Sequence, residues 1–379
     1  MTKTIGEVCR IIGGGTPSKK KPEYYEGDIP WASVRDMNVR VIRDTEYKIT
    51  ETAVAESATN IIPKGEVVIS THVGLGKVCV LGQDTAINQD LKAVIPVGDL
   101  SRWYLYYWFL SKADLLVANG KGATVKGVTV DFVKRLKINI PSLEQQAEIV
   151  AALDAAQELI DNSESQLAKL DQLVKSRFVE MFGDETEQDR WPNDTVGDVA
   201  EVCVGVVIKP TQYYRDSGVR AFRSLNIGTM FVKDSDWVYF SAEGHAKNQK
   251  SVVRKGDVLV VRSGAPGTAC VVPAVYDGSN AVDIIIAHPN VDKVDPIFLA
   301  MFTNMPHGMN QIRSRTGGAA QQHYNVGGYK ELRLSIPPLA LQHEFAAFVA
   351  EVDKSEFAVR KRLEKARQLY RAKLQEYFG

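Results

Sequence analysis

Two long segments without proline constrain the fold of this chain more than any other feature. Residues 149–183 and 345–379 are each 35 residues long, contain no proline and carry no glycine before their last position. Proline and glycine are the residues that most often interrupt a helix, so each segment is predicted to form one continuous helix. At a rise of about 1.5 Å per residue, such a helix is roughly 50 Å long.

Apolar side chains recur along both segments at alternating spacings of four and three residues, which keeps them on one side of a helix. Charge favours pairing of the two helices, because residues 141–183 hold eight acidic and three basic residues whereas 337–379 hold six and eight. The predicted interface consists of Ile149, Leu153, Ile160, Leu167, Leu170, Val174, Phe345, Val349, Val352, Val359, Leu363 and Tyr370. An alternative is that each helix packs only on its own domain and leaves its other face in solvent.

The rest of the chain is also duplicated. Three stretches return after 191 residues, namely 5–8 at 196–199, 27–33 at 218–224 and 65–69 at 256–260. This alignment makes Phe222 the counterpart of Trp31. Residues 136–141 return at 332–337, after 196 residues, so roughly five residues are inserted between the two ends of the repeat. The chain is predicted to contain two copies of one unit, a globular domain followed by a long helix, in a pseudo-twofold arrangement.

Each globular part is predicted to be an α+β domain made mostly of strands. Short alternating runs bounded by glycine predict strands at 66–70, 77–81, 257–261 and 269–272. Apolar residues at helical spacing predict one helix over 100–116 and one over 296–312. Pro141 and Pro337-Pro338 precede the long helices, Ser142 with Gln145 fits a capping box, and 184–189 form an acidic linker. The predicted segments are 1–141, 142–183, 184–338 and 339–379.

Composition indicates an ordinary globular protein, with 45% apolar and 24% charged residues. No apolar run is long enough to span a membrane and the start of the chain lacks a signal-peptide core, so a cytoplasmic protein without a membrane partner is expected. Four cysteines without a CxxC spacing argue against a metal site or a disulfide framework, and Cys79 and Cys270 are predicted to be buried in strands.

No catalytic or cofactor-binding motif is present in the sequence. It lacks a GxxxxGK[ST] phosphate loop, a GxGxxG turn and an HExxH pair, so no cofactor, catalytic residue or metal site is predicted. The nearest pattern to a metal-dependent nuclease is the loose set Asp28, Glu46 and Lys48, which is kept as an alternative of a different class.

Three pairs of polar loops lie at equivalent places in the two copies and predict contacts with nucleic acid. Since the formal net charge is zero, affinity for DNA must come from such local groups. Arg and Lys suit guanine and phosphate, whereas Asn and Gln suit adenine. The predicted residues are Thr16, Lys19, Lys20, Trp31, Ser33, Arg35, Thr71, His72, Lys77, Thr124 and Lys126 in the first copy, and Lys209, Arg223, Asn226, Arg262, Ser263, Arg315, Gln321, Gln322 and His323 in the second.

These stretches, in this order, resemble the DNA-specificity subunits of type I restriction-modification enzymes. The resemblance covers essentially the whole chain. It rests on four stretches, namely Gly-Gly-Thr-Pro-Ser at 14–18, Gly-Asp-Ile-Pro-Trp-Ala-Ser at 27–33, Asn-Gln-Asp at 88–90, and Ile-Pro-Ser-Leu-Glu-Gln-Gln at 140–146. The second copy departs from the first, with Val206 to Thr211 in place of the Thr-Pro-Ser loop.

The resemblance implies two target-recognition domains, each reading one half of a bipartite site in double-stranded DNA. It also implies that the long helices form an antiparallel coiled coil, set the length of the unread spacer and dock two methylation subunits, with restriction subunits joining them. A second alternative is a scaffold whose two domains bind protein and have no DNA specificity.

Overall fold

The computed structural model describes residues 2–122, 127–184, 186–187, 190–316 and 324–379. The chain divides into two compact units, the first formed by residues 1–164 with 361–379 and the second by residues 165–360. Each unit therefore contains a globular part and one end of each long helix. Among the described residues, no helix is both long enough and apolar enough to cross a membrane.

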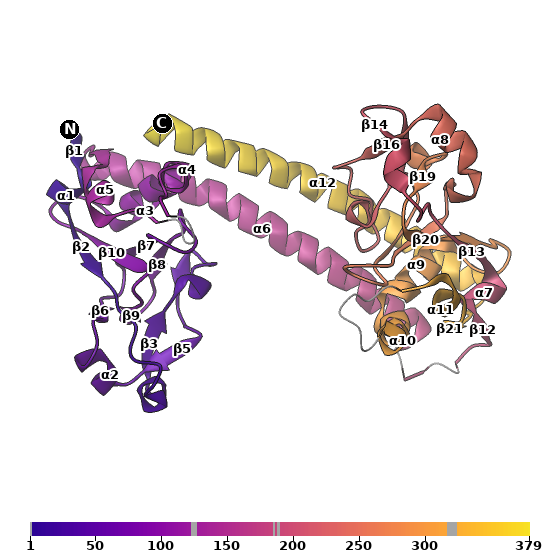
Figure 1. Ribbon diagram of the computed structural model, residues 1–379, viewed down its shortest axis with the longest axis horizontal. Coiled ribbons are helices and arrows are strands. Elements are labelled where there is room, and N and C mark those ends of the chain that lie inside the picture. The colour runs from indigo at the N-terminus through magenta and orange to yellow at the C-terminus, as the bar shows by residue number, and fades with distance from the viewer. Residues whose placement is uncertain (1, 123–126, 185, 188–189, 317–323) are drawn as a thin grey trace. The chain divides into compact units, whose positions relative to one another are not determined.

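The first unit is built in layers (Figure 1). Helix α3 (Arg102–Ser111) covers one face of a five-stranded sheet, whose strands are ordered β2 (Cys9–Gly13), β10 (Leu91–Pro96), β7 (Val67–Ser70), β8 (Val78–Leu81) and β4 (Val41–Ile42). The other face of this sheet packs on a four-stranded sheet of β5 (Tyr47–Ile49), β3 (Ile29–Ala32), β9 (Thr85–Ile87) and β6 (Asn60–Ile62).

Alternating side chains explain why β7 is buried on both faces. Val67 and Ile69 point into the core under α3, whereas Val68 points into the core between the two sheets. Successive strand residues face opposite sides, so an uninterrupted apolar run suits a strand between two layers.

The second unit repeats this order of layers. Helix α9 (Pro296–Asn304) covers a sheet ordered β13 (Ala200–Val204), β20 (Ile284–Pro289), β17 (Val258–Val261) and β18 (Ala269–Val271). A second sheet follows, ordered β14 (Tyr214–Arg215), β16 (Val238–Phe240), β15 (Val219–Phe222) and β19 (Asn280–Ala281). The four predicted strands are confirmed as β7, β8, β17 and β18. Cys79 and Cys270 are fully buried on β8 and β18, and burial raises the pKa of each thiol to about 12.

Smaller elements complete the two units. Two-stranded sheets join β1 (Thr2–Thr4) to β11 (Lys137–Asn139) and β12 (Asn193–Thr195) to β21 (Arg333–Ser335). The short helices are α1 (Ile5–Val8), α2 (Glu51–Ala55), α4 (Ala113–Ala118), α5 (Val130–Arg135), α7 (Val196–Val199), α8 (Ala242–Lys247), α10 (Pro306–Thr316) and α11 (Val326–Lys330). Six 3₁₀ turns are also described, including η2 (Val34–Asp36), η3 (Pro210–Tyr213), η4 (Ser224–Asn226) and η6 (Ala274–Tyr276).

The helices predicted over 100–116 and 296–312 are each broken in two, so these two predictions were wrong in length. Lys112 ends α3 and starts α4 with a non-helical backbone, and its Nζ donates to the carbonyl oxygen of Phe378 at 2.5 Å. Met305 ends α9 directly before Pro306, where the missing amide hydrogen prevents a continuous helix.

The two predicted long helices are confirmed as α6 (Leu143–Phe182) and α12 (Leu339–Phe378), each starting six residues before the proline-free segment. The capping box that starts α6 is present, since the Ser142 amide donates to Gln145 and the Gln145 amide donates to Ser142, each at 3.2 Å. Within each unit the helices run antiparallel. Glu164 and Arg367 form an ion pair at 2.7 Å in the first unit.

The predicted helix interface is largely buried. Seven of its residues are buried and the other five are partly buried: Leu153, Ile160, Val174, Phe345, Val349, Val352 and Leu363 in the first group, and Ile149, Leu167, Leu170, Val359 and Tyr370 in the second. Many also join the cores of the globular parts, as Val174 and Phe345 do beside α9. The helices therefore pack on their own domains as well as on each other.

One buried glutamine fixes the start of each long helix. Gln146 accepts from the Ser101 amide at 2.8 Å and donates to the carbonyl oxygens of Asp99 and Pro141 at 2.9 and 3.0 Å. Gln342 repeats this contact in the second unit, accepting from the Asp295 amide at 2.8 Å. Both side chains are fully buried, and each ties a long helix to the residues just before α3 or α9.

The strand pairing corrects the predicted match between Trp31 and Phe222. In the parallel pairs of β3 with β9 and of β15 with β19, Ala32 and Phe222 occupy the same position. Phe222 and Ala32 both face the core between the sheets, whereas Trp31 faces the outer core. The true offset here is 190 residues, and a slip of one residue exchanges the two faces of a strand.

Candidate nucleic-acid interface

An open hollow of about 480 Å³ on the first unit brings together five of the residues predicted from sequence. These residues are Thr16, Lys19, Trp31, Ser33 and Arg35. Five further residues complete the lining: Tyr25, Tyr47, Asn88, Gln89 and Asp90. The hollow combines hydrogen-bonding groups, basic side chains and aromatic rings, which are the groups that read and position nucleic acids.

The loop after β2 forms one wall of the hollow and is anchored by its glycines. A Cβ atom on Gly14 would lie 2.1 Å from the carbonyl oxygen of Asn88. The Gly15 amide donates to Ile87 at 3.0 Å, and its carbonyl oxygen accepts from the Trp31 indole at 3.1 Å. Only glycine allows this close approach of two backbones.

Thr16 and Lys19 are the two residues of this loop that line the hollow. The Thr16 hydroxyl contacts the Gln89 side-chain oxygen, while Lys19 and Lys20 are exposed. The Gln89 side chain is itself exposed, so its amide can pair with a base edge.

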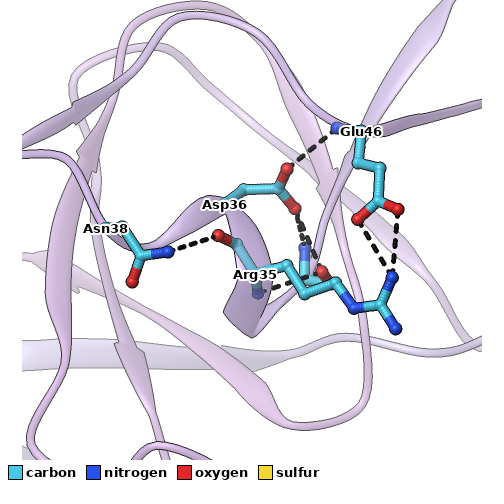
Figure 2. A network of polar contacts seen from close by, with 5 residues as sticks. Arg35, Asp36, Asn38 and Glu46 are labelled. Carbon is cyan, nitrogen blue, oxygen red and sulfur yellow. Dashed lines mark hydrogen bonds and ion pairs between the residues drawn. The ribbon is translucent and has the colours of Figure 1, made fainter. Parts of the chain in front are cut away.

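Arg35 lines the hollow from the turn η2, and Figure 2 shows its guanidinium facing Glu46. The two side chains form an ion pair at 3.0 Å, and Arg35 remains 72% exposed. The turn itself is fixed by Asp36, which accepts from the Ser33 amide at 2.7 Å and from the Glu46 amide at 2.8 Å. Arg35 is therefore an exposed cation on a rigid base.

Three aromatic rings form the floor. Tyr25, Trp31 and Tyr47 meet edge to face with centroids 5.9 to 6.5 Å apart. Trp31 is only 6% exposed, which favours a core role over base stacking, whereas Tyr47 is 42% exposed. Sequence reasoning missed Tyr25, Tyr47 and Gln89 as site residues. The Asn-Gln-Asp stretch at 88–90 was a usable signal for Gln89.

The second predicted loop of the first unit divides between buried and exposed side chains. Thr71 is buried, and its hydroxyl donates to the Asp90 carbonyl oxygen at 3.2 Å, so this predicted contact faces the interior. His72 is exposed and lies 3.8 Å from the Asp90 carboxylate. Lys77 donates to the Asn38 side chain at 2.6 Å.

The loop after β13 in the second unit has the same anchor and a different tip. A Cβ atom on Gly205 would lie 2.4 Å from the Ala281 carbonyl oxygen, and the Val206 amide donates to that oxygen at 2.8 Å. Val207 and Ile208 are exposed at the tip. Lys209 follows in a left-handed conformation with φ of 45°.

Two other predicted residues of the second unit hold the turn η4. Asn226 is fully buried, accepts from the Arg223 amide at 2.9 Å and donates to the Ser235 carbonyl oxygen at 2.7 Å, so it serves the fold. This is the position of Asp36 in the first unit. The Arg223 guanidinium donates to the Asp236 carbonyl oxygen.

Arg262 is held inside the unit and is poorly placed to read a base. Its side chain is 15% exposed, forms an ion pair with Asp283 at 2.6 Å and donates through Nε to the Tyr324 carbonyl oxygen at 2.9 Å. Ser263, next to it, is half-buried. Arg315 is exposed and donates to two carbonyl oxygens, those of Gly328 and Glu331. The remaining predicted residues lie outside the described residues: Thr124, Lys126, Gln321, Gln322 and His323.

The two units neutralise a buried acid differently. Glu66 pairs with Arg102 at 2.6 Å in the first unit, whereas Asp257 pairs with His288 at 2.7 Å in the second. The hydrogen bond to Asp257, followed by a contact with Cys203, raises the pKa of His288 to about 10.

The nuclease set Asp28, Glu46 and Lys48 lies outside the lining of this hollow, and Glu46 pairs with Arg35. Among the described residues, no group of three acidic, histidine or cysteine side chains could hold a metal ion.

Comparisons of the sequence with known proteins agree on the kind of protein that this chain resembles. Residues 1–172 match the model for the type I restriction modification DNA specificity domain. The MjaIX specificity subunit of Methanocaldococcus jannaschii is 27% identical over 66% of this chain and 64% of that protein. The EcoR124I/EcoR124II specificity subunit of Escherichia coli is 38% identical over 40% of this chain and 39% of that protein. The chain thus matches less than two thirds of the length of these two relatives.

Solved structures share the fold along the whole chain. The type I restriction-modification S subunit from M. genitalium superposes with a TM-score of 0.59 at 14% identity, covering 100% of this chain and 96% of that one. A chain from a structure of complex assembly and conformational transition in a type I system gives 0.55 at 17% identity, covering 100% and 97%. Residues 1–172 thus match a type I restriction modification DNA specificity domain, and the chain is similar in sequence to specificity subunits of type I restriction enzymes, whose S-subunit structures share its fold.

Proposed function

We propose that this chain selects the DNA sequence on which a type I restriction-modification complex acts, and that each unit reads one half of a bipartite site. The observation that carries this proposal is the doubled loop after β2 and β13. Its anchor is the same in both units, at Gly14 and Gly205, while its exposed side chains differ. A fixed backbone with variable side chains suits two readers that recognise different sequences.

In the first unit the hollow supplies both classes of DNA contact. Lys19, which lines the hollow, and Lys20, which follows it in the chain, are exposed cations suited to phosphates, which fix position without reading sequence. Arg35 and Gln89 are exposed and can contact guanine and adenine edges, respectively. Glu46 competes for Arg35, so a base contact by Arg35 requires breaking an exposed ion pair, which costs about 1 kcal/mol or less.

In the second unit the exposed candidates are Lys209 and Arg315. Arg223 is a third candidate and is partly buried. Thr71, Asn226 and Arg262 are set aside as base contacts, because burial or internal partners occupy them.

We further propose that the helix pair sets the unread spacer and docks methylation subunits, two in number, with restriction subunits joining the complex. Large apolar side chains exposed on the helices support docking, notably Phe357 at 70% and Leu173 at 48%. The cytoplasmic location expected from sequence follows from the proposed DNA substrate. No catalytic role is proposed for the chain itself.

The test is modified-base sequencing of DNA from cells that express this chain with its neighbouring methyltransferase subunit, compared with cells that lack the chain. We expect a new methylated motif of two short specific halves around a fixed gap. A chimera with residues 1–141 taken from a relative should change only one half, and residues added to α6 should lengthen the gap.

A stable complex without any chain-dependent motif would instead favour the protein-binding scaffold. DNA binding measured against salt concentration separates the two, because phosphate contacts give a steep dependence. Cleavage of DNA by the purified chain with magnesium alone would support the nuclease alternative.

A further inference from the structure

The loop after β13 exposes an apolar tip. Ile208 is 80% exposed and Val207 is 49% exposed, and no other large apolar side chain in the described part of the chain is more exposed than Ile208. Leaving such side chains in water forgoes the free energy of burying them, so an apolar tip on a fixed loop is suited to an apolar partner group.

The root of the loop is rigid. The Val206 amide donates to Ala281 at 2.8 Å, and the Val206 carbonyl oxygen accepts from the Asp283 amide at 3.2 Å. Gly205 leaves no space for a Cβ beside Ala281. The tip therefore follows a residue whose N–H and carbonyl groups are both bonded to the backbone, at Ala281 of β19 and at Asp283 just beyond it.

The backbone after the tip turns sharply. Lys209 adopts φ 45° and ψ 52°, a left-handed conformation that costs a non-glycine residue free energy, and Pro210 then begins η3. The turn follows directly after Ile208, so the exposed isoleucine is next in the chain to the exposed cation Lys209.

The surroundings of the loop are polar and basic. Its root lines an open hollow of about 390 Å³ together with residues 247–251, which include Lys247 and Lys250. Lys247 pairs with Glu243 at 2.6 Å, whereas Lys209 is exposed next to the tip. Cations around a small apolar apex match a DNA groove, where phosphates flank the bases.

We propose that Ile208, assisted by Val207, reads a thymine in the second half of the DNA site through van der Waals contact with the thymine 5-methyl group. The inference rests on the proposed function and adds the base class that this loop recognises. The thymine methyl is the apolar group that base pairs present in the major groove. The equivalent loop in the first unit carries Thr16 and Ser18, which suit hydrogen bonding instead.

The experiment uses the complex of this chain with its methyltransferase subunit and synthetic duplexes of the recognised site. Each thymine of the second half is replaced in turn by uracil, which lacks only the methyl group. We expect one replacement to weaken binding about fourfold, the factor for about 0.8 kcal/mol lost with one buried methyl. The Ile208→Ala complex should bind the thymine and uracil duplexes at that position equally.

Val275→Ala is the matched control, because Val275 is 69% exposed on η6 of the same unit. This variant should keep the fourfold preference for thymine. Ile208 has few internal contacts at 80% exposure, so its truncation should leave the thermal unfolding midpoint unchanged.

Two outcomes overturn the inference while the proposed function stands: specific binding that no uracil replacement weakens, or a thymine preference that Ile208→Ala retains. The latter would point to a protein partner for the apolar tip. Absence of any preference for the methylated motif over random DNA would instead overturn the proposed function.

Discussion

In the first unit the loop after β2 ends in Thr16, Pro17 and Ser18, whereas the equivalent loop in the second unit ends in Val207, Ile208 and Lys209. Both loops leave their sheet at a glycine whose Cβ would collide with backbone, at Gly14 and Gly205. The comparison separates two kinds of position. Contacts that fix the backbone are repeated, and side chains that face outward have diverged.

The attachment of each globular part to its long helices has diverged too. In the first unit, Arg40 forms an ion pair with Asp154 of α6 and its guanidinium lies 4.3 Å from the Trp103 ring centre. In the second unit, Phe231 lies at 5.1 Å from the guanidinium of Arg360 on α12. A cation stacked on an aromatic ring occurs in both, but the helix supplies the acid in one unit and the cation in the other.

The largest effect should come from breaking the shared loop anchor. Gly14→Ala places a Cβ 2.1 Å from a backbone oxygen, and the backbone must move, at a cost of roughly 3 kcal/mol. Gly205→Ala should do the same in the second unit. Thermal unfolding and hydrogen exchange of each unit check this, with Gly13→Ala as control because its Cβ would lie 3.7 Å from the nearest atom. Equal effects of Gly13→Ala and Gly14→Ala would show that the anchor is unimportant.

The glutamine contact is the next shared feature to test. Gln146→Ala leaves the Ser101 amide and the Asp99 carbonyl oxygen without their partner, at a cost of about 2 kcal/mol. Gln342→Ala should cost a similar amount in the second unit, measured by urea unfolding. Gln145→Ala is the matched control, since this exposed capping residue should cost about 1 kcal/mol or less. A larger effect at Gln145 than at Gln146 would contradict the assignment.

Divergent outward residues should affect one half of the site only. Arg35→Ala is expected to lose about 1 to 3 kcal/mol of discrimination at one position of the first half, without change in the second. Lys19→Ala should weaken binding to all sequences equally and lower the salt slope by about 1. Competition binding with single-base variants of the site measures both. If Arg35→Ala also relaxes recognition in the second half of the site, the proposal that each unit reads one half is wrong.

The smallest predicted effect concerns the two buried acids. The pKa of His288 rises to about 10 in the folded state from an ordinary value of 6.5, so its stabilisation is complete below pH 6.5 and is lost as pH rises through about 10. Arg102 stays charged over this range. His288 also contacts the thiol of Cys203 and lies opposite Glu201 on the paired strand β13.

The difference in the free energy of unfolding between wild type and His288→Gln should therefore narrow from pH 6 to pH 9.5, by on the order of 1 kcal/mol. For the matched variant Arg102→Gln, the difference from wild type in the free energy of unfolding should be the same at both pH values. If the difference in the free energy of unfolding narrows equally for both variants, the titration of His288 is not the cause of the pH dependence.

Much of the architecture follows from the sequence because its signals are local and repeated. The absence of proline over 35 residues predicts α6 and α12, and the offset of 191 to 196 residues predicts two units of one design. Ser142 with Gln145 places the start of α6 within one residue. Helix caps and periodic apolar stripes depend on neighbours within one or two turns, so they can be read without the fold.

Other features depend on partners far away in the chain and could not be read this way. Asn226 and Arg262 look like base readers in sequence, yet the fold buries the first and pairs the second with Asp283. Gln89 joins Thr16 across 73 positions to form the hollow. The one-residue shift that separates Trp31 from Phe222 became visible only through strand pairing.

The sequence by itself determined the duplicated unit, the long helices and the resemblance to type I specificity subunits, since all three are carried by periodicity and by ordered local motifs. The tertiary structure alone decided which of the predicted polar side chains are exposed, as the proposed contact with DNA requires. Burial and hydrogen-bond partners are set by residues from distant elements, and the same arginine or asparagine serves as a reader or as a structural anchor according to what packs beside it.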